Sequence, residues 1–362
     1  MYDVAIIGLG PAGSTLARLL PRHLRVVALD LKSERPGGFE KPCGGLLAPD
    51  AQKALARFDL TLPKELLVDP QIFSVRTIDV GSGLERYYQR YYMNLDRRKF
   101  DRWCQSLIPP ETTVLQPVQC QSLERLSDGW WVCYLERGAP KTLTARYVVG
   151  ADGAKSLVRG TLYPKKKIRQ YVSIQQWFAG DDQKPFYSCV FDERQTDCYS
   201  WALSKDGAFL FGGAYPADGC RERFEAQKRT LQQWFGQPLK TEACVVLRPR
   251  RMRDFDCGKD GAFLIGEAAG LISPSSLEGI SSAIHSAELL ARSFAVGEEG
   301  LQRRYRRNTR ILRWKIRCKL LKCPFMYWPW LRRLLLWSGV GSISLAERKE
   351  NKRVSKEREY DS

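Results

Sequence analysis

The chain has 362 residues, of which 44% are hydrophobic and 27% charged, a composition typical of a folded globular protein with room for two domains. Its formal charge is +18, and it holds only two histidines, which argues against a multi-histidine metal centre and leaves few candidates for a Ser-His-Asp triad. Eleven cysteines without a CxxC pair indicate neither a disulfide framework nor a structural zinc, so we expect no metal site.

The chain opens directly into an apolar strand, MYDVAIIGLG, with no basic leader before it. We therefore expect no signal peptide and a cytoplasmic location. No window approaches about 18 consecutive apolar residues, so we expect no transmembrane helix.

A glycine-rich loop follows the strand expected at 3–7, and a helix at 14–20 and a second strand at 25–29 come next. This order is the context that a dinucleotide-binding fingerprint requires, because the glycines let the helix and a pyrophosphate approach the backbone. An acid at the end of the second strand is placed to bind a ribose. The predicted cofactor-binding residues of this unit are Gly8, Gly10, Pro11, Ala12, Gly13 and Asp30.

The later part of the chain is expected to contain both buried strands and an antiparallel sheet, with helices between them. Buried strands are expected at 146–149 and 262–265, an antiparallel sheet over 168–215, and helices at 221–235 and 276–296. The fold class is therefore α/β, with a Rossmann-like dinucleotide-binding domain and an interleaved antiparallel-sheet substrate domain. The predicted boundaries are 1–70, 94–165 and 255–298 for the first domain, 71–93 and 166–254 for the second, and 299–362 for a basic helical C-terminal region.

Two further segments carry a family resemblance. One contains Asp152, Gly153, Ser156 and Arg159, and the other begins at Gly266. With the N-terminal glycines they form three fingerprints in order over about 280 residues, and the chain thereby resembles the FAD-dependent oxidoreductases of the para-hydroxybenzoate hydroxylase structural class. The resemblance implies FAD as the cofactor, and a nicotinamide or other electron donor that binds only transiently. Glu267 stands where that class usually has Asp.

Within that class the chain is most similar to the geranylgeranyl reductase family, and in particular to its CbrA-type branch. The likeness rests on KPCGG at 41–45, RRKFD at 97–101 and the run from 266 to 280. It implies that an arginine faces FAD and that the Cys–Gly–Gly turn lies near the isoalloxazine. The cofactor-binding residues that it adds are Cys43, Gly44, Gly45, Arg97, Asp152, Gly266, Glu267, Gly279 and Ile280. Tyr199 and Trp201 match the first half of a lipid-pocket motif whose Phe–Pro is missing here.

Three predicted catalytic residues have two interpretations each. Cys43 could donate a proton or tune the flavin, or it could pack as a small apolar residue. Tyr199 and Trp201 share one face of an expected strand, and their side chains could cover a substrate pocket or pack in the core. His285, on an apolar helix, is better explained as a hydrogen-bonded core histidine than as a base.

The C-terminal region carries most of the charge. Residues 301–362 hold 18 Lys and Arg against 5 Asp and Glu, and 301–333 contain no acid. An apolar stripe, comprising Leu301, Tyr305, Leu312, Ile316 and Leu320, predicts a helix that breaks at Pro324, before a segment rich in tryptophan. The pattern favours an amphipathic helix on an anionic membrane surface, here the inner face of the membrane, over a helix that covers the substrate cavity. No nucleic-acid-binding fold is recognised, so no nucleic-acid partner is expected.

These features predict an enzyme, an FAD-dependent oxidoreductase that passes hydride from reduced flavin to a small hydrophobic substrate, isoprenoid or quinone-like. Two alternatives remain at this stage: a flavin monooxygenase that hydroxylates an aromatic substrate, and a non-catalytic FAD-binding protein of the membrane surface.

Overall fold

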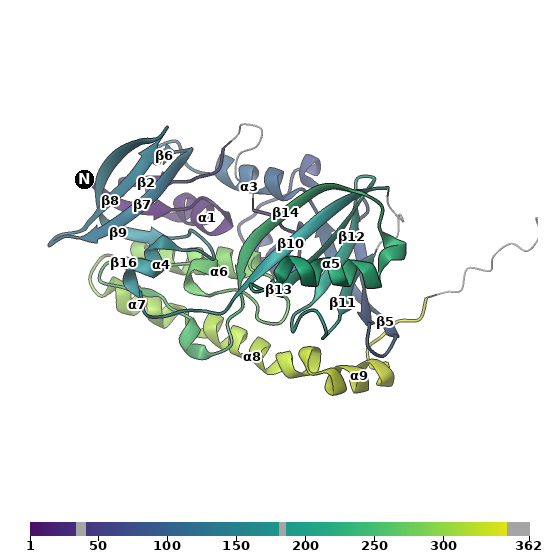
Figure 1. Cartoon of the computed structure of the whole chain (residues 1–362). Helices are drawn as coiled ribbons and strands as arrows, with labels where there is room; N and C mark the ends of the chain where they lie inside the picture. Colours follow the sequence, from purple (N-terminus) through teal and green to yellow (C-terminus); the bar gives the residue numbers. More distant parts are fainter. Residues whose placement is uncertain (34–40, 181–185, 346–362) are drawn as a thin grey trace, which may run out of the picture.

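The computed structural model describes residues 1–33, 41–180 and 186–345, and it places two β-sheets side by side with helices around them (Figure 1). The first sheet is parallel at its centre, with an antiparallel hairpin on one strand. Its main path runs β15 (Gly258–Lys259), β16 (Ala262–Leu264), β9 (Ala139–Gly150), β1 (Tyr2–Ile7), β2 (Val26–Leu29) and β6 (Thr113–Leu115), and the hairpin consists of β7 (Val118–Arg125) and β8 (Trp130–Glu136).

Both faces of this sheet are covered, which explains why its central strands are continuous apolar runs. On one face, α1 (Pro11–Leu19), α6 (Ile280–Ala295) and α7 (Leu301–Asn308) pack on the strands. On the other face lie the hairpin, α4 (Leu157–Leu162) and part of the C-terminal region. The α/β fold with a Rossmann-like domain, an antiparallel-sheet domain and C-terminal helices is confirmed.

The second sheet has eight strands, and every pairing in it is antiparallel except that of β4 with β11. Its order is β14 (Pro238–Leu247), β10 (Gln170–Ala179), β13 (Ala208–Pro216), β12 (Ser200–Lys205), β11 (Phe186–Phe191), β4 (Ile72–Asp79), β5 (Leu84–Asn94) and β3 (Leu46–Leu47). One face packs against α5 (Cys220–Thr230), and the other carries an aromatic cluster that includes Tyr199 and Trp201. The exact domain boundaries stay a prediction, and β3 shows that part of 1–70 pairs with the second sheet.

Shorter elements connect the two sheets. Helix α2 (Pro49–Ala56) precedes β4, and α3 (Arg97–Ser106) follows β5, with Asp96 capping it through a 3.0 Å hydrogen bond from the Lys99 amide. The helix expected at 221–235 ends at Thr230 and is followed by a 3₁₀ turn, and the one expected at 276–296 begins at Ile280. That turn is η2 (Gln232–Trp234), and the other 3₁₀ helices of the described residues are η1 (Lys64–Leu66), η3 (Met252–Asp254) and η4 (Gly266–Ala269).

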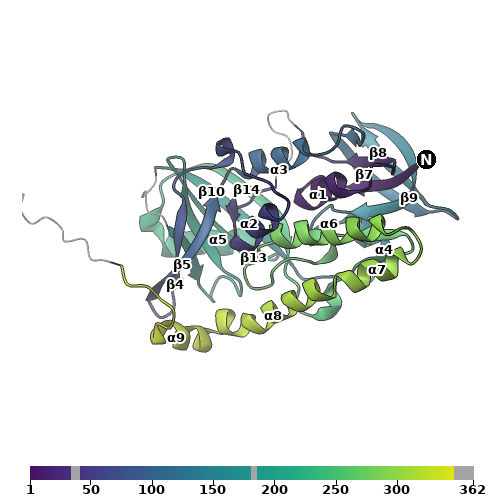
Figure 2. The same ribbon diagram turned by 180° about the vertical axis from the view of Figure 1, so that it is seen from behind.

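The C-terminal region forms three helices along one edge of the molecule, from the first sheet to the second (Figures 1 and 2). After α7 come α8 (Arg310–Tyr327) and α9 (Pro329–Ser338), and residues 346–362 of the predicted region lie outside the described residues. The predicted break at Pro324 is wrong, because α8 continues to Tyr327 and ends where Trp328 turns extended before Pro329. The packing of Met326 and Tyr327 against the aromatic cluster accompanies this extra turn. Among the described residues, no helix is long and apolar enough to cross a membrane.

Candidate functional site

The glycine loop between β1 and α1 leaves room where a phosphate would have to approach. A Cβ on Gly13 would lie 1.8 Å from the Gly8 carbonyl oxygen, and one on Gly8, at φ +99°, would lie 2.7 Å from the Ala151 carbonyl oxygen. A Cβ on Gly10 would meet only the Lys32 Nζ, at 3.9 Å. After Pro11, which has no N–H, the amides of Ala12 and Gly13 in the first turn of α1 have no acceptor within the helix. The loop therefore offers amides, open space and a cation, a donor set that fits a pyrophosphate.

Asp30 is buried at the end of β2, where the fingerprint places it. Its carboxylate accepts a hydrogen bond from the Leu9 amide and another, at 2.6 Å, from the Lys32 amide. The side chain therefore holds the glycine loop in shape. Its contact with a ribose stays a prediction.

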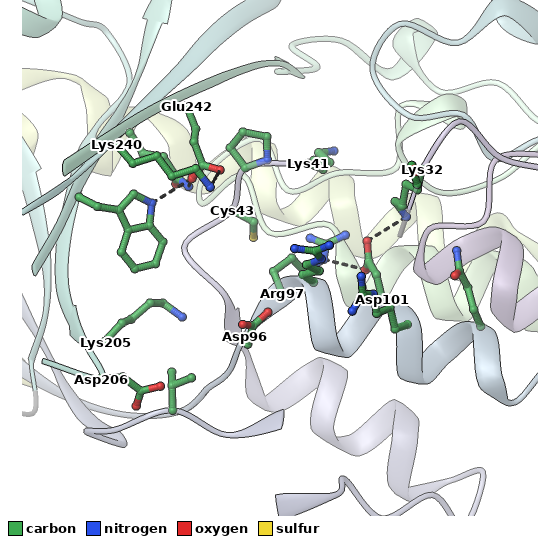
Figure 3. Close-up of a pocket in the computed structure, with 18 of the residues that line it drawn as sticks. Lys32, Lys41, Cys43, Asp96, Arg97, Asp101, Lys205, Asp206, Lys240 and Glu242 are labelled. Atoms are coloured by element: carbon green, nitrogen blue, oxygen red, sulfur yellow. Dashed lines mark hydrogen bonds and ion pairs between the residues drawn. The ribbon is translucent and has the colours of Figure 1, made fainter. Parts of the chain in front are cut away.

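A chain of charged side chains runs from the glycine loop to the Cys–Gly–Gly turn (Figure 3). Lys32 Nζ lies 2.9 Å from Asp101 Oδ2, and Arg97 Nε donates to Asp101 Oδ1 at 2.8 Å. Arg97 also hydrogen-bonds the side chain of Cys43. Because Arg97 and Asp101 are one turn apart on α3, the RRKFD segment supplies two links of this chain. The structure thus places Arg97 beside the Cys–Gly–Gly turn, and the contacts of both with FAD stay predictions.

The charges around Cys43 lower the pKa of its thiol. Burial alone would raise the pKa of the Cys43 thiol, but the nearby Arg97 guanidinium and the Lys41 ammonium hold it below its usual value. Asp101 follows the same logic, since two cations outweigh the cost of its burial and lower its pKa.

Glu267 bridges two segments that are distant in the sequence. Its carboxylate forms an ion pair with Lys41 and accepts a 2.9 Å hydrogen bond from the Leu247 amide. Arg159 donates to the Glu267 backbone carbonyl at 2.9 Å and so fixes this turn to α4. A Cβ on Gly266 would lie 3.0 Å from that of Ala12, so this turn packs directly on the start of α1.

Three other predicted cofactor-binding residues lie at the starts of two helices. The Asp152 carboxylate accepts from Ser156 Oγ at 2.5 Å and from the Leu157 amide at 2.7 Å, so it caps α4. Gly279 and Ile280 form the N-terminus of α6. The contacts of these three residues with FAD stay predictions.

A cavity of about 340 Å³ opens between α3, the segment at 41–43 and the second sheet. Lys32, Lys41, Cys43 and Arg97 line the first of its two walls. The opposite wall comes from the second sheet, and Figure 3 shows several of these side chains directed into the same space. They are Gln175, Trp177, Lys205, Lys240 and Glu242.

Lys205 is the buried cation of the second wall. It is 6% exposed, its Nζ donates to the Leu95 carbonyl oxygen at 2.7 Å, and a Cβ on Gly45 would lie 2.5 Å from that Nζ. Burial lowers its pKa to about 8. A lysine with this pKa can hold a proton at neutral pH and release it readily.

Trp201 and Tyr199 lie behind the Cys–Gly–Gly turn. A Cβ on Gly44 would lie 3.8 Å from the Trp201 Nε1, and this buried indole nitrogen has no hydrogen-bond acceptor within the described part of the chain. Tyr199 lies deeper, with its ring 5.8 Å from that of Trp201 and its hydroxyl donating to the Ser276 carbonyl oxygen at 2.6 Å. Cys43 thus lines the cavity, Trp201 packs against the backbone beside it, and Tyr199 belongs to the aromatic cluster.

His285 takes no part in this site. Its Nε2 lies 3.3 Å from Arg57 Nη1 and its Nδ1 3.5 Å from Ser281 Oγ, on α6. Within 1–33, 41–180 and 186–345, no group of three or more His, Cys, Asp or Glu side chains is placed to hold a metal ion.

Sequence reasoning missed Lys205, Trp177 and Glu242 as site residues. Lys205 had a usable signal, because it follows Trp201 and Leu203 at intervals of two and so shares their face of β12. Trp177 and Glu242 had none, since their approach to the cavity depends on the pairing of β10 with β14.

Comparisons with known proteins identify the family of the chain. Residues 112–306 match the family described as FAD binding domain. The CbrA protein of Escherichia coli O6:H1 is 52% identical over 346 residues, which are 94% of each chain.

Two solved structures share the fold. A geranylgeranyl bacteriochlorophyll reductase-like protein from Thermoplasma acidophilum matches with a TM-score of 0.71 at 18% identity, covering 92% of this chain and 98% of its own. HpxO from Klebsiella pneumoniae, solved with FAD, matches with a TM-score of 0.67 at 14% identity, covering 93% and 94%. The chain belongs, with the CbrA proteins, to the FAD-binding family of oxidoreductases and monooxygenases, and its cofactor is FAD.

Proposed function

We propose that this FAD-dependent oxidoreductase reduces a hydrophobic, quinone-like substrate that enters the cavity between the two sheets. The observation that carries the proposal is Lys205, a buried ammonium with a pKa of about 8 on the wall opposite Arg97 and Cys43. Reduction of a quinone carbonyl by hydride leaves a negative charge on oxygen and requires one proton. Lys205 is placed to supply that proton, whereas hydride addition to an isolated isoprenoid double bond puts no charge on an oxygen.

The cofactor end of the site is formed by the glycine loop and the charged side chains next to it. Lys32, Lys41 and Arg97 supply positive charge along the cavity, which suits a pyrophosphate with two negative charges. FAD bound there supplies the hydride once an external donor such as NAD(P)H has reduced it.

The chain's own residues orient the substrate and move the proton. Val68, Pro42 and Trp177 contribute apolar surface to the cavity, which a quinone ring can contact. Lys205 Nζ gives its proton to the reduced oxygen and regains one from solvent. Its hydrogen bond to the Leu95 carbonyl holds the ammonium in place between turnovers.

Two other activities remain to be compared with this proposal, namely reduction of a prenyl chain and monooxygenation. The missing Phe–Pro after Trp201 and the charged cavity lining favour a substrate with a polar head over a plain prenyl chain. Placement within the geranylgeranyl reductase family therefore stays a prediction. A monooxygenase in the same fold would consume oxygen in proportion to product.

The experiment follows anaerobic reoxidation of photoreduced, FAD-loaded protein by stopped-flow absorbance, with a short-chain quinone and a geranylgeranyl lipid as competing acceptors. We expect the quinone to reoxidise the flavin, and Lys205→Met to slow this step about 100-fold or more. Lys240→Met is the matched control, since Lys240 lines the same cavity but is paired with Glu242. The rate should fall as pH rises through about 8, and Lys205→Arg should move that fall to higher pH.

Three results would overturn the proposal. The first is equal loss in the Lys205 and Lys240 variants, and the second is reoxidation by the geranylgeranyl lipid alone. The third is substrate-dependent oxygen uptake that matches product formation, which would assign the protein as a monooxygenase.

A further inference from the structure

Helix α8 has two apolar faces, and only one of them packs on the protein. Leu312 and Ile316 are buried against the first sheet, and Leu320 packs beside them. Of the stripe expected from the sequence, Leu312, Ile316 and Leu320 therefore lie on the inner face of α8, whereas Leu301 and Tyr305 are buried on α7. The protein core accounts for this face completely.

The outer face carries a second apolar stripe, and we call this set of residues the outer stripe. From Ile311 to Trp328 its members are spaced three, seven, four and three residues apart, and at 3.6 residues per turn they share one side of α8. They are Ile311, Trp314, Leu321, Phe325 and, just past the helix, Trp328, followed on α9 by Trp330, Leu334 and Trp337. Each is more than half exposed, with Trp314 at 62% and Trp337 at 72%. A contiguous exposed patch of this kind on a folded protein marks an interaction surface.

Cations flank the outer stripe on both sides. Arg310 and Arg317 lie along one edge of the α8 stripe, and Lys315 and Lys322 lie along the other, all of them exposed. Long basic side chains beside an apolar stripe can keep their charges at a lipid headgroup level while the stripe enters the interface.

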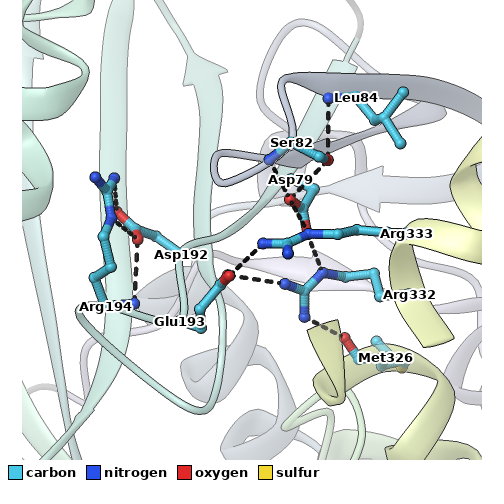
Figure 4. Close-up of polar contacts among 9 residues, drawn as sticks. All are labelled: Asp79, Ser82, Leu84, Asp192, Glu193, Arg194, Met326, Arg332 and Arg333. Atoms are coloured by element: carbon cyan, nitrogen blue, oxygen red, sulfur yellow. Dashed lines mark hydrogen bonds and ion pairs between the residues drawn. The ribbon is translucent and has the colours of Figure 1, made fainter. Parts of the chain in front are cut away.

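Helix α9 is fixed in place by a buried ion cluster (Figure 4). Arg332 Nε lies 2.6 Å from Asp79 Oδ2, and Arg333 Nε lies 3.2 Å from Asp79 Oδ1. Both arginines also pair with Glu193. This cluster uses two cations of the tail for attachment to the second sheet, and it holds the outer stripe of α9 toward solvent.

We infer that the outer stripe docks the protein on an anionic lipid bilayer. Tryptophans at an apolar–polar boundary, flanking cations and helices without enough apolar length to span a membrane are the features of an interfacial helix. The charge is complementary to anionic headgroups, since the tail up to Arg333 contains no acid to oppose them. The inference does not depend on the substrate proposed above.

The test is sedimentation of full-length, FAD-loaded protein with vesicles of phosphatidylcholine alone or mixed with phosphatidylglycerol. We expect binding that requires phosphatidylglycerol and weakens with salt. Trp314→Gln with Phe325→Gln should lower the partition coefficient about tenfold. The matched control is Phe73→Gln with Tyr91→Gln, two equally exposed aromatic residues on the second sheet, which should bind like the parent.

Two double variants, each of which removes two exposed lysine charges, complete the test. Lys315→Gln with Lys322→Gln should lower binding at low salt by about fivefold per cation, whereas Lys64→Gln with Lys99→Gln should not. Flavin absorbance of each variant shows that the protein is folded. The inference fails if the parent stays in the supernatant with anionic vesicles at low salt, or if stripe and control variants bind alike. It also fails if the stripe variants abolish a lipid-independent dimer, because a second copy would then cover this face.

Discussion

The two walls of the cavity are built in opposite ways. The first wall comes from short contiguous segments and adjoins the glycine loop at Lys32, and the fit of that loop to a cofactor depends on backbone clearance, as at Gly8 and Gly13. The second wall collects single side chains from three strands, and its properties depend on their chemistry, as at Lys205. A change in the glycine loop should therefore abolish cofactor binding, while a change in the second sheet should alter reactivity or stability and leave FAD bound.

The largest effect is expected at the glycine loop. Gly13→Val should abolish FAD uptake, because even its Cβ would lie 1.8 Å from the Gly8 carbonyl oxygen and would force α1 away from β1. The measurement is the ratio of flavin to protein absorbance after incubation with FAD. Gly160→Ala, at a position where a Cβ would meet nothing within 4 Å, is the control and should keep its flavin. A yellow Gly13→Val protein would contradict the steric argument.

The next effect separates the second sheet from the first wall. Asp79→Asn should cost up to about 3–5 kcal/mol of unfolding free energy, because it leaves the buried Arg332 with only the partly exposed Glu193 as a carboxylate partner. Despite its burial, hydrogen bonds and charge from Arg332 hold the pKa of Asp79 below its usual value. The stability that this pair contributes is thus complete at neutral pH and is lost only as pH falls through that lowered pKa.

Urea unfolding at neutral and acidic pH measures this difference. The difference in unfolding free energy between the parent and Asp79→Asn should become smaller at acidic pH. The folded variant should still bind FAD as the parent does. A variant that is fully stable but colourless would show that the ion cluster of the second sheet and the cofactor site are not independent.

A smaller effect is expected at Asp30. Asp30→Ala should weaken FAD binding by about 1–3 kcal/mol, since the carboxylate that holds the Leu9 and Lys32 amides is removed. Titration of the apoprotein by flavin fluorescence gives the affinity. Asp30→Asn, which keeps one carbonyl acceptor, should fall between the parent and Asp30→Ala. Equal affinity in all three would mean that Asp30 neither shapes the loop nor meets the ribose.

The smallest effect is expected where one side chain joins both walls. Glu267→Asp restores the residue usual in this class, but its shorter side chain cannot keep both the Lys41 ion pair and the Leu247 amide. We expect a change in FAD affinity of no more than about 1 kcal/mol, the scale of one net hydrogen bond. A larger loss would indicate that the bridge between the walls positions the cofactor.

The C-terminal helices illustrate how local and tertiary information divide. The sequence predicted a basic helix with an apolar stripe, and Leu312 and Ile316 do lie on one face. The sequence could not show that the core buries this stripe, or that Trp314 and Trp337 belong to a second, exposed stripe. The burial of a side chain depends on which other elements pack against it. The wrong break at Pro324 has the same origin, since tertiary packing of Tyr327 supports a turn that local preference disfavours.

By itself the sequence determined the cofactor end of this protein. A glycine loop, a strand before it and an acid after the next strand are local features, and their steric requirements are the same in any chain that builds them. Only the tertiary structure decided the second wall, because Trp177, Lys205 and Glu242 meet through strand pairing between distant segments. The pKa of Lys205 belongs to this second group, since it is lowered by burial, a property that neighbouring elements create and that no single segment of the sequence contains.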